Sequence, residues 1–100
     1  MNTTEAPFCI WVDADSCPKK AREIALKCAA RIHVPAFLVA NRQIPYDKHN
    51  AMAQMILVPS VQDSADTYIV EHALPEDIVI TKDIPFAARL VQKGICTIND

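Results

Sequence analysis

Short apolar runs alternate with amphipathic segments along this chain, which is the pattern of an α/β fold. Residues 10–12 and 36–40 are unbroken apolar runs, typical of strands that are buried on both faces of a sheet. Later runs predict a third buried strand at 55–58, a fourth strand at 77–81 and a fifth at 95–98. Because helical segments separate most of the strands, we expect a three-layer α/β/α fold around a mainly parallel sheet of about five strands.

Three helices are predicted between these strands. The first runs from Pro18 to about Ile32, with an apolar stripe at Ala21, Ile24, Ala25, Cys28, Ala29 and Ile32. The second begins near Asp63, with an inward face at Ile69, Val70, Ala73 and Leu74. The third begins at Pro85 and ends at Gly94, with apolar positions at Ala87, Ala88 and Val91. Residues 43–54 lack a period, so we expect a loop followed by a turn or two of helix within 47–54.

Composition narrows the class of protein. The chain of 100 residues is 51% hydrophobic and 22% charged, which suits a single folded domain over residues 1–100. No apolar run has the length of a bilayer span and the N-terminus lacks a signal pattern, so we expect a cytoplasmic protein without membrane contact. The four cysteines have neither zinc nor disulfide spacing. A net charge of −2 argues against electrostatic coating of nucleic acid, and the single glycine excludes a glycine-rich phosphate loop.

Acidic residues follow the predicted strands and open the second helix. Asp13 and Asp15 end the first strand, Asp83 follows the fourth, and Asp63 and Asp66 lie on the inward side of the second helix's first turn. In an open parallel sheet, ligands bind beyond the carboxyl ends of the strands. Up to five carboxylates would meet there, a density of oxygen ligands that suits Mg²⁺ or Mn²⁺ and phosphoryl chemistry.

Each acid also has a structural explanation. Asp63 could be a helix N-cap, Asp66 could complement a helix dipole, and Asp15 and Asp83 could cap the helices that follow them. Asp13 is the hardest to explain in this way, because it directly follows an apolar strand and has no basic neighbour in sequence.

Polar and basic residues near the same edge are candidates for binding a substrate. Asn41 and Thr81 stand at strand ends and could donate to a phosphate, although turn formation would explain them equally well. Lys19, Arg42 and Lys82 could neutralise phosphates, or they could belong to an ordinary solvated surface.

Four motifs together resemble the uncharacterised bacterial YaiI/YqxD family, which looks PIN-like. They are Trp11-Val12-Asp13-Ala14-Asp15-Ser16-Cys17-Pro18, Val39-Ala40-Asn41, Asp63-Ser64-Ala65-Asp66 and Val79-Ile80-Thr81-Lys82-Asp83-Ile84-Pro85. The resemblance implies a parallel sheet with helices on both sides and a nuclease-type centre with a divalent metal. By that resemblance Asp13, Asp66 and Asp83 would be the catalytic metal ligands, with Asp15 and Asp63 beside them and Asn41 at the rim.

The chain departs from the family pattern in three places. Gln62 stands where members usually have a glycine, and Lys82 replaces a small residue. The lysine would either weaken metal binding or supply a phosphate contact. Members also continue past the fifth strand, whereas this chain stops at Asp100. An apolar patch left open by that missing piece would favour a homodimer.

Three functions compete at this point. The first is a metal-dependent phosphodiesterase that acts on RNA or single-stranded nucleic acid. The second is a phosphatase of the haloacid dehalogenase type, whose opening motif is also a strand followed by Asp-x-Asp; its motif order disagrees, because Asp63 and Asp66 precede Thr81 here. The third is a non-catalytic module that binds metal or a phosphorylated ligand, or that pairs with an antitoxin.

Overall fold

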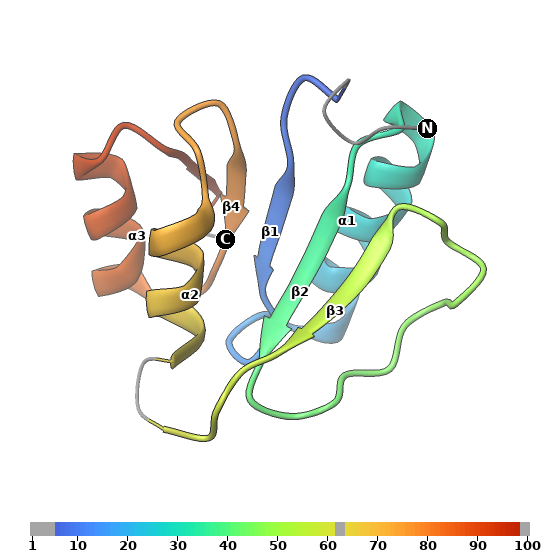
Figure 1. Ribbon diagram of the computed structural model, residues 1–100, viewed down its shortest axis with the longest axis horizontal. Helices are drawn as coiled ribbons and strands as arrows, with labels where there is room; N and C mark the ends of the chain where they lie inside the picture. Colours follow the sequence, from blue (N-terminus) through green and yellow to red (C-terminus); the bar gives the residue numbers. More distant parts are fainter. Residues whose placement is uncertain (1–5, 62–63, 99–100) are drawn as a thin grey trace.

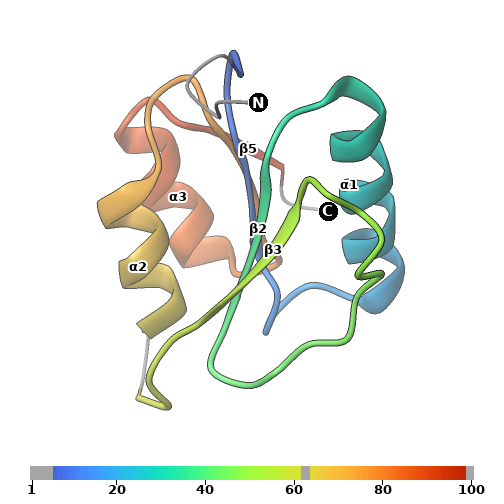
Figure 2. The ribbon, with the colours of Figure 1, turned by 45° about the vertical axis from the view of Figure 1, so that its right-hand side comes forward.

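A parallel sheet forms the centre of the computed structural model, which describes residues 6–61 and 64–98 (Figure 1). The elements along the chain are β1 (Ile10–Asp13), α1 (Lys19–Ile32), β2 (Ala36–Ala40), β3 (Ala53–Leu57), α2 (Ser64–His72), β4 (Ile78–Ile80), α3 (Ile84–Gln92) and β5 (Cys96–Ile98). The strand order is β3-β2-β1-β4-β5, and every pair is parallel. Helices α2 and α3 cover one face and α1 covers the other, so the three-layer α/β/α expectation is confirmed (Figure 2).

Strand β1 is the middle strand and the point at which strand order reverses. Ile10 pairs with Ala36 of β2 on one side and with Ile78 of β4 on the other. All four β1 residues are buried. Ligands bind to open α/β sheets at such a reversal, beyond the carboxyl ends of the strands. Asp13, the last residue of β1, therefore lies at the position where this topology favours a site.

Alternation along β1 divides the core into two layers. Val12 faces α1 and packs in the layer that includes Ala29 and Leu38, all three of them fully buried. Trp11 points to the opposite side and packs with residues from α2 and α3, including Ile69 and Phe86. Burying a side chain of this size contributes about 1.5–3 kcal/mol, so both layers hold β1 in place.

The third strand and the segment before it differ from the expectation. Strand β3 covers Ala53–Leu57 rather than 55–58, and it is an edge strand with Leu57 60% exposed, so a strand buried on both faces is wrong here. The helical turns expected within 47–54 are also wrong, because tight turns lead directly into β3. The Asp47 carboxylate accepts from His49 N–H and the Asn50 side chain accepts from Met52 N–H. Such local bonds offer the backbone an alternative to helix.

The structure shows which apolar positions of α2 and α3 are buried. Helix α3 buries Phe86, Ala87 and Leu90, whereas Ala88 is exposed and Val91 is 64% exposed. Leu74 lies beyond the end of α2 and is 55% exposed. The predicted inward position of Leu74 is therefore wrong, because α2 ends at His72. For α3, contact with the sheet decides which of its apolar positions are buried.

Only part of the predicted α1 stripe is buried. Ala25 and Ala29 pack into the core together with Leu26. Ile24 and Ile32, which the spacing places on the inward face, are 57% and 51% exposed, so their predicted burial is wrong. The helix is turned toward β1, β2 and β3, and the other half of its apolar stripe has no cover among the described elements.

Asp77 is a buried hydrogen-bond centre whose role local sequence does not indicate. It is 2% exposed and accepts from the Trp11 indole N–H, the Cys9 backbone N–H and the Leu74 backbone N–H, each at 2.9 Å. The carboxylate therefore joins the start of β4 to the start of β1 and to the end of the α2 region.

Replacing Asp77 with Ala is expected to lower the free energy of unfolding by about 3 kcal/mol, because three donors lose their acceptor. Urea denaturation measures the change. Glu76→Ala is the matched control, since Glu76 is an exposed neighbour and should change stability by less than about 0.5 kcal/mol. Equal losses in both variants would contradict a special role for Asp77.

Candidate functional site

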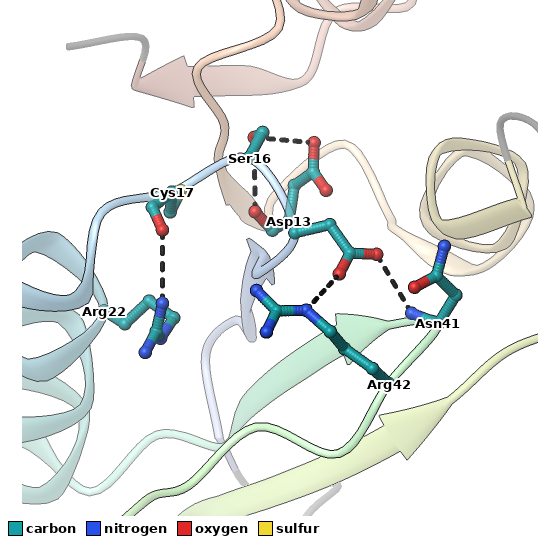
Figure 3. A network of polar contacts seen from close by, with 7 residues as sticks. Asp13, Ser16, Cys17, Arg22, Asn41 and Arg42 are labelled. Atoms are coloured by element: carbon teal, nitrogen blue, oxygen red, sulfur yellow. Dashed lines mark hydrogen bonds and ion pairs between the residues drawn. The ribbon is translucent and has the colours of Figure 1, made fainter. Parts of the chain in front are cut away.

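Two hydroxyl groups orient the carboxylate of Asp13 at the end of β1. Asp13 is 2% exposed, and its Oδ2 accepts from Thr81 Oγ1 at 2.7 Å and from Ser16 Oγ at 3.0 Å. Figure 3 shows Ser16 beside this carboxylate, in the turn that follows β1. Because both hydroxyl groups use Oδ2, Oδ1 is the oxygen that they leave to other contacts.

The same hydroxyl groups tie the end of β1 to the end of β4. Thr81 Oγ1 accepts from Asp83 N–H at 3.0 Å, and Ser16 Oγ accepts from Lys82 N–H at 3.1 Å. Each hydroxyl therefore acts as a donor toward Asp13 and an acceptor from the backbone after β4. This fixes the spacing between Asp13 and Asp83.

Asp83 and Asp66 come from helix starts that face this point. The side chain of Asp83 caps α3 by accepting from Phe86 N–H at 3.1 Å, so the capping explanation is confirmed for this residue. Asp66 lies in the first turn of α2 and is 8% exposed, which confirms its inward placement. Backbone N–H groups at a helix N-terminus point toward such side chains, so both helix starts are favourable positions for an acidic residue.

Asp15 binds the segment that follows β2. Its Oδ2 accepts from Asn41 N–H at 2.9 Å, and its Oδ1 lies 3.5 Å from Arg42 Nε. The N-cap of α1 is Pro18, without a side-chain cap bond, so the proposed capping role of Asp15 is wrong for that helix. Arg42 is largely exposed, so the ion pair contributes little stability, and its main effect is to reduce the negative charge of Asp15.

Four of the five predicted acids line one cavity of about 390 Å³ at the carboxyl end of β1: Asp13, Asp15, Asp66 and Asp83. The fifth, Asp63, lies outside the described residues, as does Gln62. Asn41 also lines the cavity, together with the hydroxyl groups of Ser16, Ser60 and Ser64. The three serines were not predicted, and their signal in the sequence is weak, because serine is common in turns of every function.

The described acids do not form a closed metal cage. Within residues 6–61 and 64–98, no three His, Cys, Asp or Glu side chains lie close enough together to hold one metal ion. The donor set suits an ion that one or two carboxylates bind and that keeps several waters, as Mg²⁺ does. It does not suit a tetrahedral zinc site, which needs four protein ligands or three with one open position.

Burial sets the ionisation of Asp13. Desolvation raises the pKa of this carboxyl group, the bonds from Thr81 and Ser16 lower it, and the negative charges of Asp15 and Asp83 raise it again. The net effect is a raised pKa. The folded protein therefore carries a carboxylate whose negative charge is unfavourable where it stands, unless a positive charge binds beside it.

The neighbouring thiol is not a nucleophile. Burial and the charge of Asp13 raise the pKa of Cys17 to about 11, so the thiol stays protonated near neutral pH. Its Sγ lies 3.5 Å from the carbonyl oxygen of Ile80.

The predicted substrate-binding residues are distributed around the acidic cavity. Lys19 lines a separate cavity of about 220 Å³ between α1 and the loop before β3, and Arg42 pairs with Asp15. Lys82 and Thr81 line a small cavity of about 30 Å³ next to Cys17, and Thr81 is 1% exposed. Of the five predicted substrate-binding residues, Asn41 is the one that lines the acidic cavity itself. The substrate-binding roles of all five residues stay predictions.

The fold and this site define an α/β protein with an acidic cavity where the strand order of a parallel sheet reverses. A family model described as "Uncharacterized BCR, YaiI/YqxD family" matches residues 11–100. The chain belongs to this family, as the four sequence motifs indicated. No solved structure matches it. In the described part of the chain, no helix has both the length and the apolar character needed to cross a membrane.

Several bacterial relatives share the matched region. A UPF0178 protein of Treponema denticola is 45% identical over 91 residues, which cover 91% of this chain and 57% of the relative. A UPF0178 protein of Geobacter sulfurreducens is 46% identical over 86 residues, covering 85% of this chain and 56% of the relative. A UPF0178 protein of Pseudomonas fluorescens is 45% identical over 91 residues, covering 90% of this chain and 59% of the relative. This chain therefore spans little more than half the length of these relatives.

Replacing Asp13 with Asn is expected to raise the free energy of unfolding at pH 7, in buffer with a chelator, by on the order of 1 kcal/mol, or about 4–8 °C in Tm. The pKa of Asp13 is raised in the folded state. Protonated Asp13 therefore stabilises the folded state. This stabilisation is fully present below the unfolded-state pKa of about 4 and is lost as pH rises through the folded-state pKa. Asn has no such ionisation, so the gain should disappear on acidification. Thermal unfolding at several pH values measures it.

Thr81→Val provides the opposite control. This variant removes a donor from the buried Asp13 carboxylate and should lower the free energy of unfolding by about 1–3 kcal/mol at pH 7. A loss of stability in Asp13→Asn at pH 7 would contradict the argument that the charge of Asp13 destabilises the fold.

Proposed function

We propose that this protein is a divalent-metal-dependent phosphodiesterase of the nuclease type, acting on RNA or single-stranded nucleic acid in the acidic cavity. The observation that carries the proposal is the placement of Asp13. A 2% exposed carboxylate with a raised pKa ends the central strand, in a cavity with three further acids. Groups held in an unfavourable ionisation state within a cleft are characteristic of functional sites.

Mg²⁺ or Mn²⁺ is the proposed cofactor. Asp13 and Asp66 would hold it together with several waters, and Asp83 lines the same cavity. When bound, the ion would supply a hydroxide nucleophile and neutralise charge on the phosphate. The cavity volume of about 390 Å³ falls in the range of small-ligand sites and leaves space for a phosphate beside the acids.

Other residues of the cavity would orient the Asp13 carboxylate and bind the substrate phosphate. Thr81 and Ser16 hold Oδ2 of Asp13, which would leave Oδ1 to the ion. Asn41 and Ser60 line the same cavity, and the Asn41 side-chain amide and the Ser60 hydroxyl group would donate to phosphate oxygens.

Flanking phosphates would meet the basic residues outside the cavity. Lys19, Arg42 and Lys82 stand near the same edge of the sheet, and they would bind the backbone on either side of the reacting phosphodiester. With a net charge of −2, the chain would grip nucleic acid weakly and in a salt-dependent manner.

The proposal is tested with labelled single-stranded RNA and a chromogenic phosphomonoester, each incubated with the protein and Mn²⁺. RNA cleavage is expected, without monoester turnover, and a chelator should abolish it. Asp66→Asn should reduce the cleavage rate by about 100-fold or more, because it removes a proposed metal ligand. Asp47→Asn is the matched control and should cleave normally, since Asp47 is an exposed acid that lines the separate cavity between α1 and the loop before β3.

Three results would contradict the proposal, and the first two would assign the site a different function. Monoester turnover without RNA cleavage would indicate a phosphatase of the haloacid dehalogenase type. Mn²⁺ binding without turnover of either substrate would indicate a non-catalytic module for metal or phosphorylated ligands. Cleavage that persists unchanged in Asp66→Asn would indicate a contaminating nuclease.

A further inference from the structure

An apolar groove of about 360 Å³ lies on the face of the sheet that α1 covers in part. Its walls come from α1, from the strands β1, β4 and β5, and from the residues before β1. The side chains that form it include Phe8, Ile24, Ile32, Ile78, Ile80 and Ile98. Among the described residues that line it, none is charged.

The groove exists because the two faces of the sheet are covered unequally. Helices α2 and α3 share one face, with α3 packed beside β5 and α2 beside β1 and β2. On the other face α1 packs on β1, β2 and β3, and no described element lies over β4 and β5 there (Figure 2). An α/β domain normally covers both faces of its sheet, whereas on this side the described residues supply only part of a layer.

The sequence of α1 is apolar over a wider stripe than the described fold buries. Ile24, Cys28 and Ile32 follow one another at intervals of four residues and form one face of the helix. Ile24 is 57% and Ile32 51% exposed, and Ile98 across the groove is 48% exposed. A contiguous apolar surface of this kind is a mark of an interaction site.

Both ends of the described chain reach this groove. Phe8 precedes β1 and Ile98 ends β5, and both side chains line it. The matched region makes up 57% of the Treponema denticola relative and 56% of the Geobacter sulfurreducens relative. The rest of each relative is joined to the matched region at one of its ends or at both. At either end, an additional segment would start at the rim of the groove.

We propose that the groove is the docking surface for the polypeptide segment that the longer relatives carry outside the matched region. The docked part would present an uncharged, apolar face, because every residue that lines the groove is apolar or a cysteine. It would complete the layer that α1 begins and would cover β4 and β5. This inference is independent of the chemistry of the acidic cavity.

A chimera tests the proposal directly. The unmatched segment of the Treponema denticola relative is joined to this chain at the end where the relative carries it. Cys28 is exposed in the groove and reports its cover through the rate of maleimide labelling, resolved by peptide mass spectrometry. Docking should slow the labelling of Cys28 by about tenfold or more relative to this chain alone. A cysteine placed by Val91→Cys on α3, outside the groove, should label at the same rate in both proteins.

A second pair of variants separates docking from a general change in the fold. Ile24→Asp in the chimera should restore fast labelling of Cys28, because it places a charge in the apolar groove. Val91→Asp, at a side chain that is 64% exposed on α3, should leave Cys28 protected. The same segment added as a separate polypeptide gives an independent reading, with protection that saturates as its concentration rises.

Unchanged labelling of Cys28 in both formats would overturn the proposal. Protection of Cys28 in this chain alone, rising with protein concentration and accompanied by a dimer in sedimentation, would also overturn it. That result would assign the groove to a second copy of the chain, as the homodimer expected from the sequence would require.

Discussion

The hydrogen bond from the Thr81 hydroxyl to the Asp13 carboxylate is the contact on which the acidic cavity depends. It joins residues 68 positions apart in sequence and spans the point where strand order reverses. Through its second bond, Thr81 also fixes the start of α3 and with it Asp83. A buried carboxylate without donors would be too costly to keep, whereas one that is fully neutralised would be inert. Asp13 lies between these cases, because the two hydroxyl groups orient it and leave its pKa raised.

The remaining architecture supports this arrangement from both sides. On one face, Trp11 packs between β1 and the α2–α3 layer, and Asp77 anchors its indole N–H. That layer sets the position of Asp66 at the start of α2. On the other face, α1 packs against β1, β2 and β3, and no other described helix covers β4 and β5 there. The acidic cavity is therefore supported by the α2–α3 layer, which is the more completely packed one. The groove proposed as a docking surface lies on the other side of the sheet, beside α1.

Local patterns in the sequence were sufficient to predict the class of fold and the strand ends that bring acids together. Apolar runs located β1 and β2, and helical spacing placed Asp66 on the inward side of α2, since these features depend on neighbours in sequence. The edge position of β3, the exposure of Ile24 and the role of Asp77 depend on which distant elements meet, so periodicity carried no signal for them. The contacts of Ser16 and Thr81 with Asp13 were missed for the same reason.

The central claim is that Asp13 is a carboxylate kept for a divalent cation. Calorimetric titration of the chelator-treated protein with Mn²⁺ tests it most directly, on the parent chain and on Asp13→Asn, with Asp47→Asn as the control acid outside the cavity. The account predicts saturable binding that Asp13→Asn weakens by about tenfold or more and that Asp47→Asn leaves unchanged. Absence of binding in the parent chain, or equal binding in the parent chain and Asp13→Asn, would contradict it.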